Sequence, residues 1–299
     1  MTTPQTGIFA LGTHAHSYLE LTLDEGADPR AALTVAAGLS EPRTTMGGVN
    51  LVVGIRPELW AAVLPEHAPA GLTGFGEPVV GPDGFTMPAT QRDIFLWTAG
   101  GSRDVVFDTV TAIIDAFAGL ASVDDEVSGW TYHRDLDLTG FIDGTENPHL
   151  SEAPRHVLVP AGEPGAGGSV LLVQKWRHDA HAWNAVPVAE QERVIGRTKA
   201  DSVELDPRPE TAHAARTDQD DFGKIFRRNV AYGSAREHGT MFVGFCHRKA
   251  PLADMLDSMA GVGGVRDALT RYTTPLTGAY YFVPALDDLA VLAPPADDD

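Results

Sequence analysis

The sequence predicts an α+β fold of two ferredoxin-like domains with antiparallel sheets, arranged as in a dimeric α+β barrel. Strand-like and helix-like segments alternate in the order β-α-β-β-α-β, which is the ferredoxin-like pattern. Each half also has a strand leading into a helix that begins at a proline, Pro57 and Pro251. The length of 299 residues suits two domains of ~150 residues.

The first half, residues 1–155, is expected to form the N-terminal domain. Alternating or β-branched apolar residues predict its strands, and apolar residues spaced along one face predict its helices. The expected elements are, in order, a strand at 16–23, a helix at 29–39, a strand at 49–55, a helical turn at 57–64, a strand at 93–99, a helix at 105–120 and a strand at 130–133.

The second half, residues 156–299, is expected to repeat the pattern less regularly. Its expected elements are a strand at 170–176, helical segments at 180–195 interrupted at Pro187, a strand at 240–246, a helix at 251–259 and a strand at 280–283. The glycine-rich segment 160–168 is the best candidate for the domain boundary. It does not connect a parallel strand to a helix, so we interpret it as a loop and not as a phosphate-binding motif.

Charge and cysteine content exclude several classes of protein. A net charge of −19 disfavours nucleic acid and anionic membrane surfaces as partners. Cys246 is the single cysteine, so neither an intramolecular disulfide nor a multi-cysteine metal site can form. The N-terminus lacks a signal-peptide pattern and no apolar stretch reaches the ~18 residues of a membrane span. We therefore expect a cytoplasmic location.

The segment 140–148, Gly-Phe-Ile-Asp-Gly-Thr-Glu-Asn-Pro, is the most informative in the chain. It places the Asp143 carboxylate between apolar residues and Gly144, which permits a positive φ angle. One interpretation is an Asx turn, in which Asp143 bonds nearby backbone amides. The other is an acid held beside apolar groups for proton transfer.

Three further side chains are candidates for chemistry. His213 lies among alanines that would let a bulky planar group approach. Arg227 and Asn229 alternate on a possible strand, so they would share a face and could both donate to developing negative charge. The pairs His14 and His16, and His178 and His181, lack a third ligand at a recognisable interval and are not interpreted as metal sites.

Together these segments resemble the dye-decolourising peroxidases, in particular the shorter bacterial members without an export signal. The nine-residue segment fits the family signature, and other segments follow it in the family's order and approximate spacing. They are 168–176, 195–199, 212–213, 227–229 and 276–284. The interval from His213 to Arg227 is slightly short for the family. Tyr280 and Tyr281 stand where aliphatic or phenylalanine side chains are expected.

The resemblance implies haem b as the cofactor, with His213 as the proximal iron ligand. It places Asp143, Arg227 and Asn229 on the distal side as catalytic residues. The further haem contacts that it implies are Gly144, Thr145, Glu146 and Arg197. Aromatic side chains could relay electrons to bulky substrates, although we interpret them as core and interface residues. They are Trp176, Trp183, Tyr232, Tyr280 and Tyr281.

The implied activity is reduction of hydrogen peroxide, with oxidation of dyes or other small aromatic or phenolic reductants by single electrons through a ferryl intermediate. The alternative is a haem-binding or iron-handling protein with incidental peroxidase activity. A homo-oligomer is expected, because symmetric homo-oligomers are common. An aspartate base predicts best activity at acidic pH, provided that Asp143 is not strongly desolvated.

Overall fold

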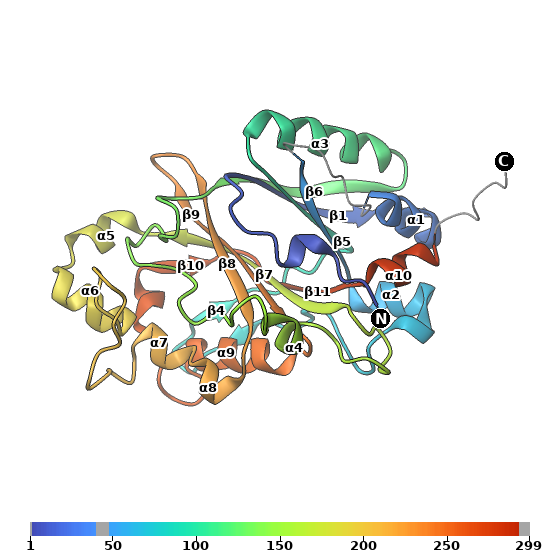
Figure 1. Cartoon of the computed structure of the whole chain (residues 1–299). Helices are drawn as coiled ribbons and strands as arrows, with labels where there is room; N and C mark the ends of the chain where they lie inside the picture. The colour runs from blue at the N-terminus through green and yellow to red at the C-terminus, as the bar shows by residue number, and fades with distance from the viewer. Residues whose placement is uncertain (1, 40–47, 293–299) are drawn as a thin grey trace, which may run out of the picture.

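The computed structural model describes residues 2–39 and 48–292, and its main sheet closes into a barrel (Figure 1). Nine strands pair in the order β10-β7-β11-β2-β5-β1-β6-β8-β9, and β9 also pairs with β7. Neighbouring strands are antiparallel throughout. The strands are β1 (Ala15–Leu23), β2 (Asn50–Ile55), β5 (Ile94–Gly100), β6 (Ala121–Trp130), β7 (Ser169–His178), β8 (Phe226–Gly233), β9 (His238–Cys246), β10 (Thr273–Pro275) and β11 (Ala279–Val283).

The barrel consists of two four-stranded groups with the same topology, which confirms the predicted duplicated ferredoxin-like fold. The first group has the order β2-β5-β1-β6, and the second has the order β8-β9-β7-β11. Helices α1 (Pro29–Leu39) and α3 (Arg103–Ala116) connect the strands of the first group. In the second group α9 (Ala250–Ala260) follows β9, and a long helical segment separates β7 from β8. Short pairings of β11 with β2 and of β6 with β8 join the groups.

The remaining elements are short and lie outside the barrel. They are α2 (Pro57–Val63), α4 (Ala153–Val157), α5 (Ala180–Ala185), α6 (Val188–Ile195), α7 (His213–Arg216), α8 (Gln219–Phe222), α10 (Leu286–Ala290), the 3-10 turns η1 (Thr6–Ile8), η2 (Pro65–His67) and η3 (Ala268–Arg271), and a two-stranded sheet of β3 (Val79–Val80) and β4 (Thr86–Met87). In Figure 1, α5 to α9 lie at the opposite end of the molecule from α1 and α2.

Aromatic side chains fill the interior of the barrel. Tyr18, Phe95, Trp97, Phe245 and Tyr281 are almost fully buried there and pack with aliphatic residues from both groups. Complete burial of each large apolar side chain contributes ~1.5–3 kcal/mol. A separate core lies under α1, α2 and α3, and another lies under α9. The main sheet is therefore covered on its inner face and over most of its outer face.

The end of the first half differs from the prediction. The last strand is β6 at Ala121–Trp130 and not 130–133, and the preceding helix ends at Ala116 instead of at residue 120. Most side chains of β6 are exposed, and the strand contains Asp124, Asp125 and Glu126. An exposed strand does not need apolar alternation, so its polar sequence gave no strand signal.

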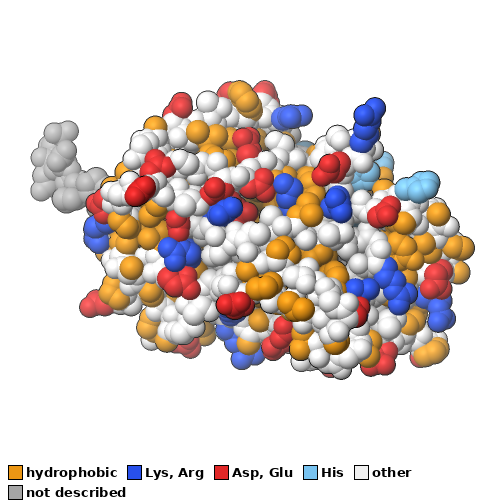
Figure 2. Space-filling view, turned by 180° about the vertical axis from the view of Figure 1, so that it is seen from behind, with side chains coloured by type: hydrophobic (Ala, Val, Ile, Leu, Met, Phe, Trp, Pro, Cys, Tyr) orange, Lys and Arg blue, Asp and Glu red, His pale blue; other side chains and the backbone are white. Residues whose placement is uncertain are grey.

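Acidic side chains are scattered among lysines and arginines on the face shown in Figure 2, together with small apolar areas. None of the helices in the two described ranges has the length and apolar character that crossing a membrane requires.

Candidate active site

A large cavity lies between the outer face of β7, β8 and β9 and the helices α6 to α9. It contains about 1440 Å³ not filled by protein atoms, including solvent at its mouth. Seven of the eight residues expected at the site line it, namely Asp143, Thr145, Glu146, Arg197, His213, Arg227 and Asn229. Gly144 is not among the lining residues, although its neighbours on both sides are.

Asp143 lies in the loop after β6 and is held against β8. Its carboxylate accepts from the Asn229 side-chain amide at 2.7 Å and from the Asn229 backbone N–H at 3.1 Å. These donors are 86 residues away, so the Asx-turn interpretation is wrong. Gly144 has φ +75°, as predicted, and this conformation turns the chain directly after the acid.

Burial raises the pKa of Asp143 above its ordinary value, and the nearby Asp137 carboxylate raises it further. Arg227 and the hydrogen bonds from Asn229 act in the opposite direction but do not outweigh burial. The cavity leaves part of Asp143 accessible, yet the protein packed around it withdraws it from bulk water. Strong desolvation was the exception attached to the expected acidic optimum, so the raised pKa moves the expected pH range upward from that of an ordinary aspartate.

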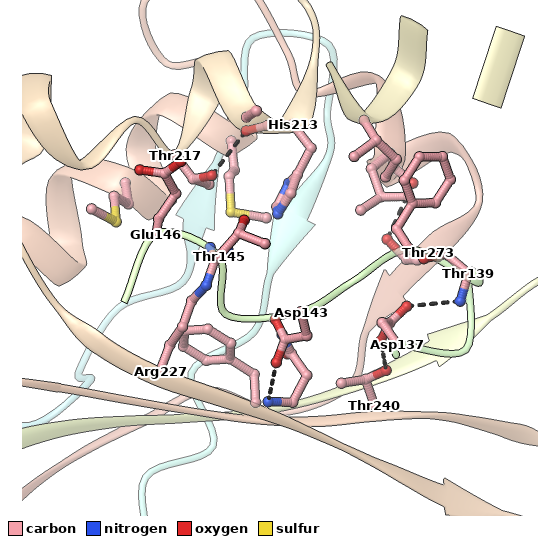
Figure 3. A pocket seen from close by; sticks show the side chains of 18 of the residues that line it. Asp137, Thr139, Asp143, Thr145, Glu146, His213, Thr217, Arg227, Thr240 and Thr273 are labelled. Carbon is pink, nitrogen blue, oxygen red and sulfur yellow. Dashed lines mark hydrogen bonds between the residues drawn. The ribbon is translucent and has the colours of Figure 1, made fainter. Parts of the chain in front are cut away.

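Arg227 and Asn229 share one face of β8, as the alternation predicts, and both line the cavity. Arg228 points the other way and lies over the Trp97 ring inside the barrel. The Nε of Arg227 is buried and has no hydrogen-bond partner among the described residues. In Figure 3 its side chain reaches into the cavity beside Thr145. A buried guanidinium nitrogen without a partner favours binding of an additional acceptor at this point.

His213 begins α7 on the other side of the cavity from Asp143 (Figure 3). Its Nδ1 donates to the Asp267 carboxylate at 2.6 Å, and the Asp267 side chain is fully buried. This bond fixes the ring and leaves Nε2 as the nitrogen able to bind a metal. A carboxylate partner also makes the imidazole a stronger electron donor.

Charged side chains occupy the edge of the cavity. Arg197 donates to Glu146 and to the backbone oxygen of Ser202. Arg208 lies nearby and is paired with Glu204 and Asp218. Arg197 and Arg208 thus place two guanidinium groups at the edge of the cavity, in addition to Arg227.

Comparison with known proteins identifies this arrangement. The model of the Dyp-type peroxidase N-terminal domain matches residues 20–131, and that of the Dyp-type peroxidase C-terminal domain matches residues 134–288. The chain belongs to the Dyp-type peroxidase family. The resemblance found in the sequence is therefore confirmed.

Similar members of the family are known from several bacteria. A dye-decolorizing peroxidase of Rhodococcus erythropolis is 36% identical over 93% of this chain and 85% of its own length. One from Mycolicibacterium paratuberculosis is 35% identical over 94% of this chain and 84% of its own. The solved structure of DyPB from Rhodococcus jostii is 35% identical with a TM-score of 0.87, over 96% of this chain and 97% of that one. A variant of that protein was solved in complex with heme.

Sequence reasoning missed two residues of the site. Asp267 is 54 residues from His213 and lies in a loop without a motif. Asn147 was recognised only as part of the signature. Its side-chain amide bonds both the backbone N–H and the backbone oxygen of Arg227, each at 2.9 Å. The signal available for Asn147 was its position four residues after Asp143. No local signal pointed to Asp267.

Proposed function

We propose that the protein is a haem b peroxidase that reduces hydrogen peroxide and oxidises dyes or other small aromatic or phenolic reductants by single electrons. One observation carries this proposal. A carboxylate-bound histidine faces, across one cavity, an acid and an arginine whose buried Nε has no hydrogen-bond partner among the described residues. Membership of the Dyp-type peroxidase family supports it. Dye-decolorizing peroxidase is also the name of the two curated relatives cited above.

The lining of the cavity fits a haem. A broad apolar surface suited to a porphyrin ring is provided by Leu172, Phe242, Leu252, Met255, Leu256 and Met259. His213 offers one imidazole nitrogen, while Arg197 and Arg208 could pair with the acidic groups at the porphyrin edge. Within the described ranges no three His, Cys, Asp or Glu side chains are grouped to hold a metal ion. Iron bound by His213 alone would therefore need a macrocycle for its other ligands.

We infer the following roles for the residues. The bound haem would supply the redox chemistry. Asp143 accepts the proton from one oxygen of hydrogen peroxide and returns it to the other oxygen, the one that leaves. Arg227 stabilises the negative charge on the leaving oxygen, and its buried Nε–H has no other acceptor among the described residues. Asn229 holds the Asp143 carboxylate in place and orients it toward the cavity.

The remaining expectations stay part of the proposal. Gly144, Thr145 and Glu146 contact the edge of the haem, and Arg197 pairs with one of its propionates. The chain divides into two domains between residues 155 and 156. The N-terminal domain carries the acid motif, and the C-terminal domain carries His213, Arg227 and Asn229. The protein acts in the cytoplasm as a homo-oligomer.

An optical spectrum of haem-loaded protein before and after one equivalent of hydrogen peroxide tests the proposal. Rapid change of the haem band, strongly slowed in Arg227→Ala and Asp143→Ala, is the expected result. A haem band that does not respond to peroxide would favour the haem-binding or iron-handling alternative. Failure to bind haem at all would refute the role of His213.

A further inference from the structure

A hydrogen-bonded tyrosine and glutamate lie inside the barrel, away from the cavity. The Tyr281 hydroxyl donates to the Glu20 carboxylate at 2.5 Å. Tyr281 is 0% exposed and Glu20 is 5% exposed. The Phe95 ring stacks on Tyr281 at 5.3 Å. A Cβ on Gly54 would lie 2.8 Å from the Tyr281 Cβ, so the glycine makes room for this ring.

A buried carboxylate is an expensive partner for a phenol. Ionised carboxylates lose much solvation on burial, whereas a neutral amide would accept the same hydrogen bond at less cost. Burial raises the pKa of Glu20 to about 7. Asp125 raises it further, whereas the Tyr281 hydroxyl, Arg92 and Lys175 lower it. Near neutral pH a substantial fraction of Glu20 is thus ionised and able to take up a proton.

The tyrosines inside the barrel differ in whether a base accepts a hydrogen bond from the hydroxyl. The hydroxyls of Tyr18 and Tyr232 are buried and have no hydrogen-bond partner in the described part of the chain. Loss of an electron makes a phenol strongly acidic, so its oxidation is favoured where a base accepts the proton at once. Tyr281 has such a base and Tyr18 does not, although both rings contact Phe95.

Tyr281 is separated from the cavity by a single layer of strands. It is paired with Leu171 of β7 and faces the barrel interior, while the adjacent Leu172 faces the cavity. Glu20 lies opposite Asp125 of β6, whose side chain is 33% exposed and bonds to Lys175.

We propose that Tyr281 is a second redox site, which gives one electron to the haem after peroxide has oxidised the haem, while its phenolic proton moves to Glu20. The step reduces the cofactor by one electron and leaves a neutral tyrosyl radical beside a protonated Glu20. A reductant that supplies one electron restores Tyr281, and the proton returns from Glu20. This inference rests on the proposed peroxidase function.

Freeze-quench electron paramagnetic resonance of haem-loaded protein, with one equivalent of hydrogen peroxide and no reductant, tests the proposal. We expect a radical signal that narrows when the protein contains ring-deuterated tyrosine. Tyr281→Phe should lose this signal and keep the peroxide-induced change of the haem band, and Tyr18→Phe should keep both. In Glu20→Gln the signal should form on the order of 10²-fold more slowly, the loss expected for a positioned base.

The outcomes separate this inference from the proposed function. A normal haem response with an unchanged radical in Tyr281→Phe would refute the role of Tyr281 and leave the peroxidase function intact. A wild-type haem band that ignores peroxide would overturn both. Infrared titration of the haem-free protein provides a second readout. The band of the protonated Glu20 carboxyl should disappear as the pH rises through neutrality, and Glu20→Gln should lack that band. A Glu20 that stays protonated there would refute its role as acceptor.

Discussion

Replacing Asp267 with asparagine should weaken haem binding at His213 by about 10- to 100-fold. The Asp267 carboxylate accepts from His213 Nδ1 at 2.6 Å and from the Leu269 backbone N–H at 2.8 Å. Asparagine has one acceptor oxygen for these two donors, so one of them would face an amide N–H. A buried hydrogen bond left unmade costs about 1–3 kcal/mol, and tenfold in affinity corresponds to about 1.4 kcal/mol.

Titration of the haem-free protein with haem measures the affinity, and the midpoint potential of the bound iron measures electron donation by the imidazole. We expect a higher potential in Asp267→Asn, because loss of the carboxylate makes His213 a weaker donor to ferric iron. Thr270→Val is the matched control, since it removes the Thr270 hydroxyl bond to the Asp267 backbone oxygen and keeps the carboxylate. Unchanged affinity and potential in Asp267→Asn, or equal shifts in the control, would refute the reasoning.

Three other predictions concern Arg227, Asp143 and Gly144, and a helical glycine outside the site serves as a control. Arg227→Ala should slow the reaction with peroxide on the order of 10²- to 10³-fold, at least as much as Asp143→Ala does, in single-turnover measurements of the haem band. The same rate constant in the wild type should rise with pH and level off above a pKa higher than the ordinary ~3.9 of aspartate, because burial raises the pKa of Asp143 and only the ionised form accepts a proton. A rate constant that already levels off near the ordinary pKa of aspartate would contradict this. Gly144→Ala should lower the free energy of unfolding by about 1–2 kcal/mol, because the residue has φ +75° and its Cβ would lie 3.0 Å from Asn147 Nδ2. In the same denaturant unfolding, the control Gly38→Ala in α1 should instead stabilise by about 0.5–1 kcal/mol, since a Cβ there would meet no described atom within 4 Å.

Features of the fold and site that depend only on nearby residues could be predicted from the sequence. Partial apolar alternation located β1 and a run of apolar residues located β5, each within a residue or two, and Pro187 correctly divided α5 from α6. The same alternation predicted that Arg227 and Asn229 share a face. The prediction for Arg227 and Asn229 succeeded because a strand fixes the direction of each side chain regardless of what lies opposite.

Contacts between distant segments could not be predicted in this way. The partner of His213 is a lone Asp267, and the partner of Tyr281 is Glu20, 261 residues away. The exposed β6 carries no apolar pattern, so its position became evident only from its pairing with β1. The raised pKa of Asp143 likewise follows from packing of the whole chain around the acid.

The signature segment does more than supply an acid. Asn147 accepts from the Arg227 backbone N–H and donates to the Arg227 backbone oxygen, so its side-chain amide takes the place of a neighbouring strand along β8. Only a side chain with one donor and one acceptor in amide geometry can do this, because aspartate lacks the donor and leucine lacks both. Asp143 meanwhile bonds the side chain and backbone of Asn229. The segment therefore fixes the acid, the arginine and the amide relative to one another, although about 80 residues separate them in the chain.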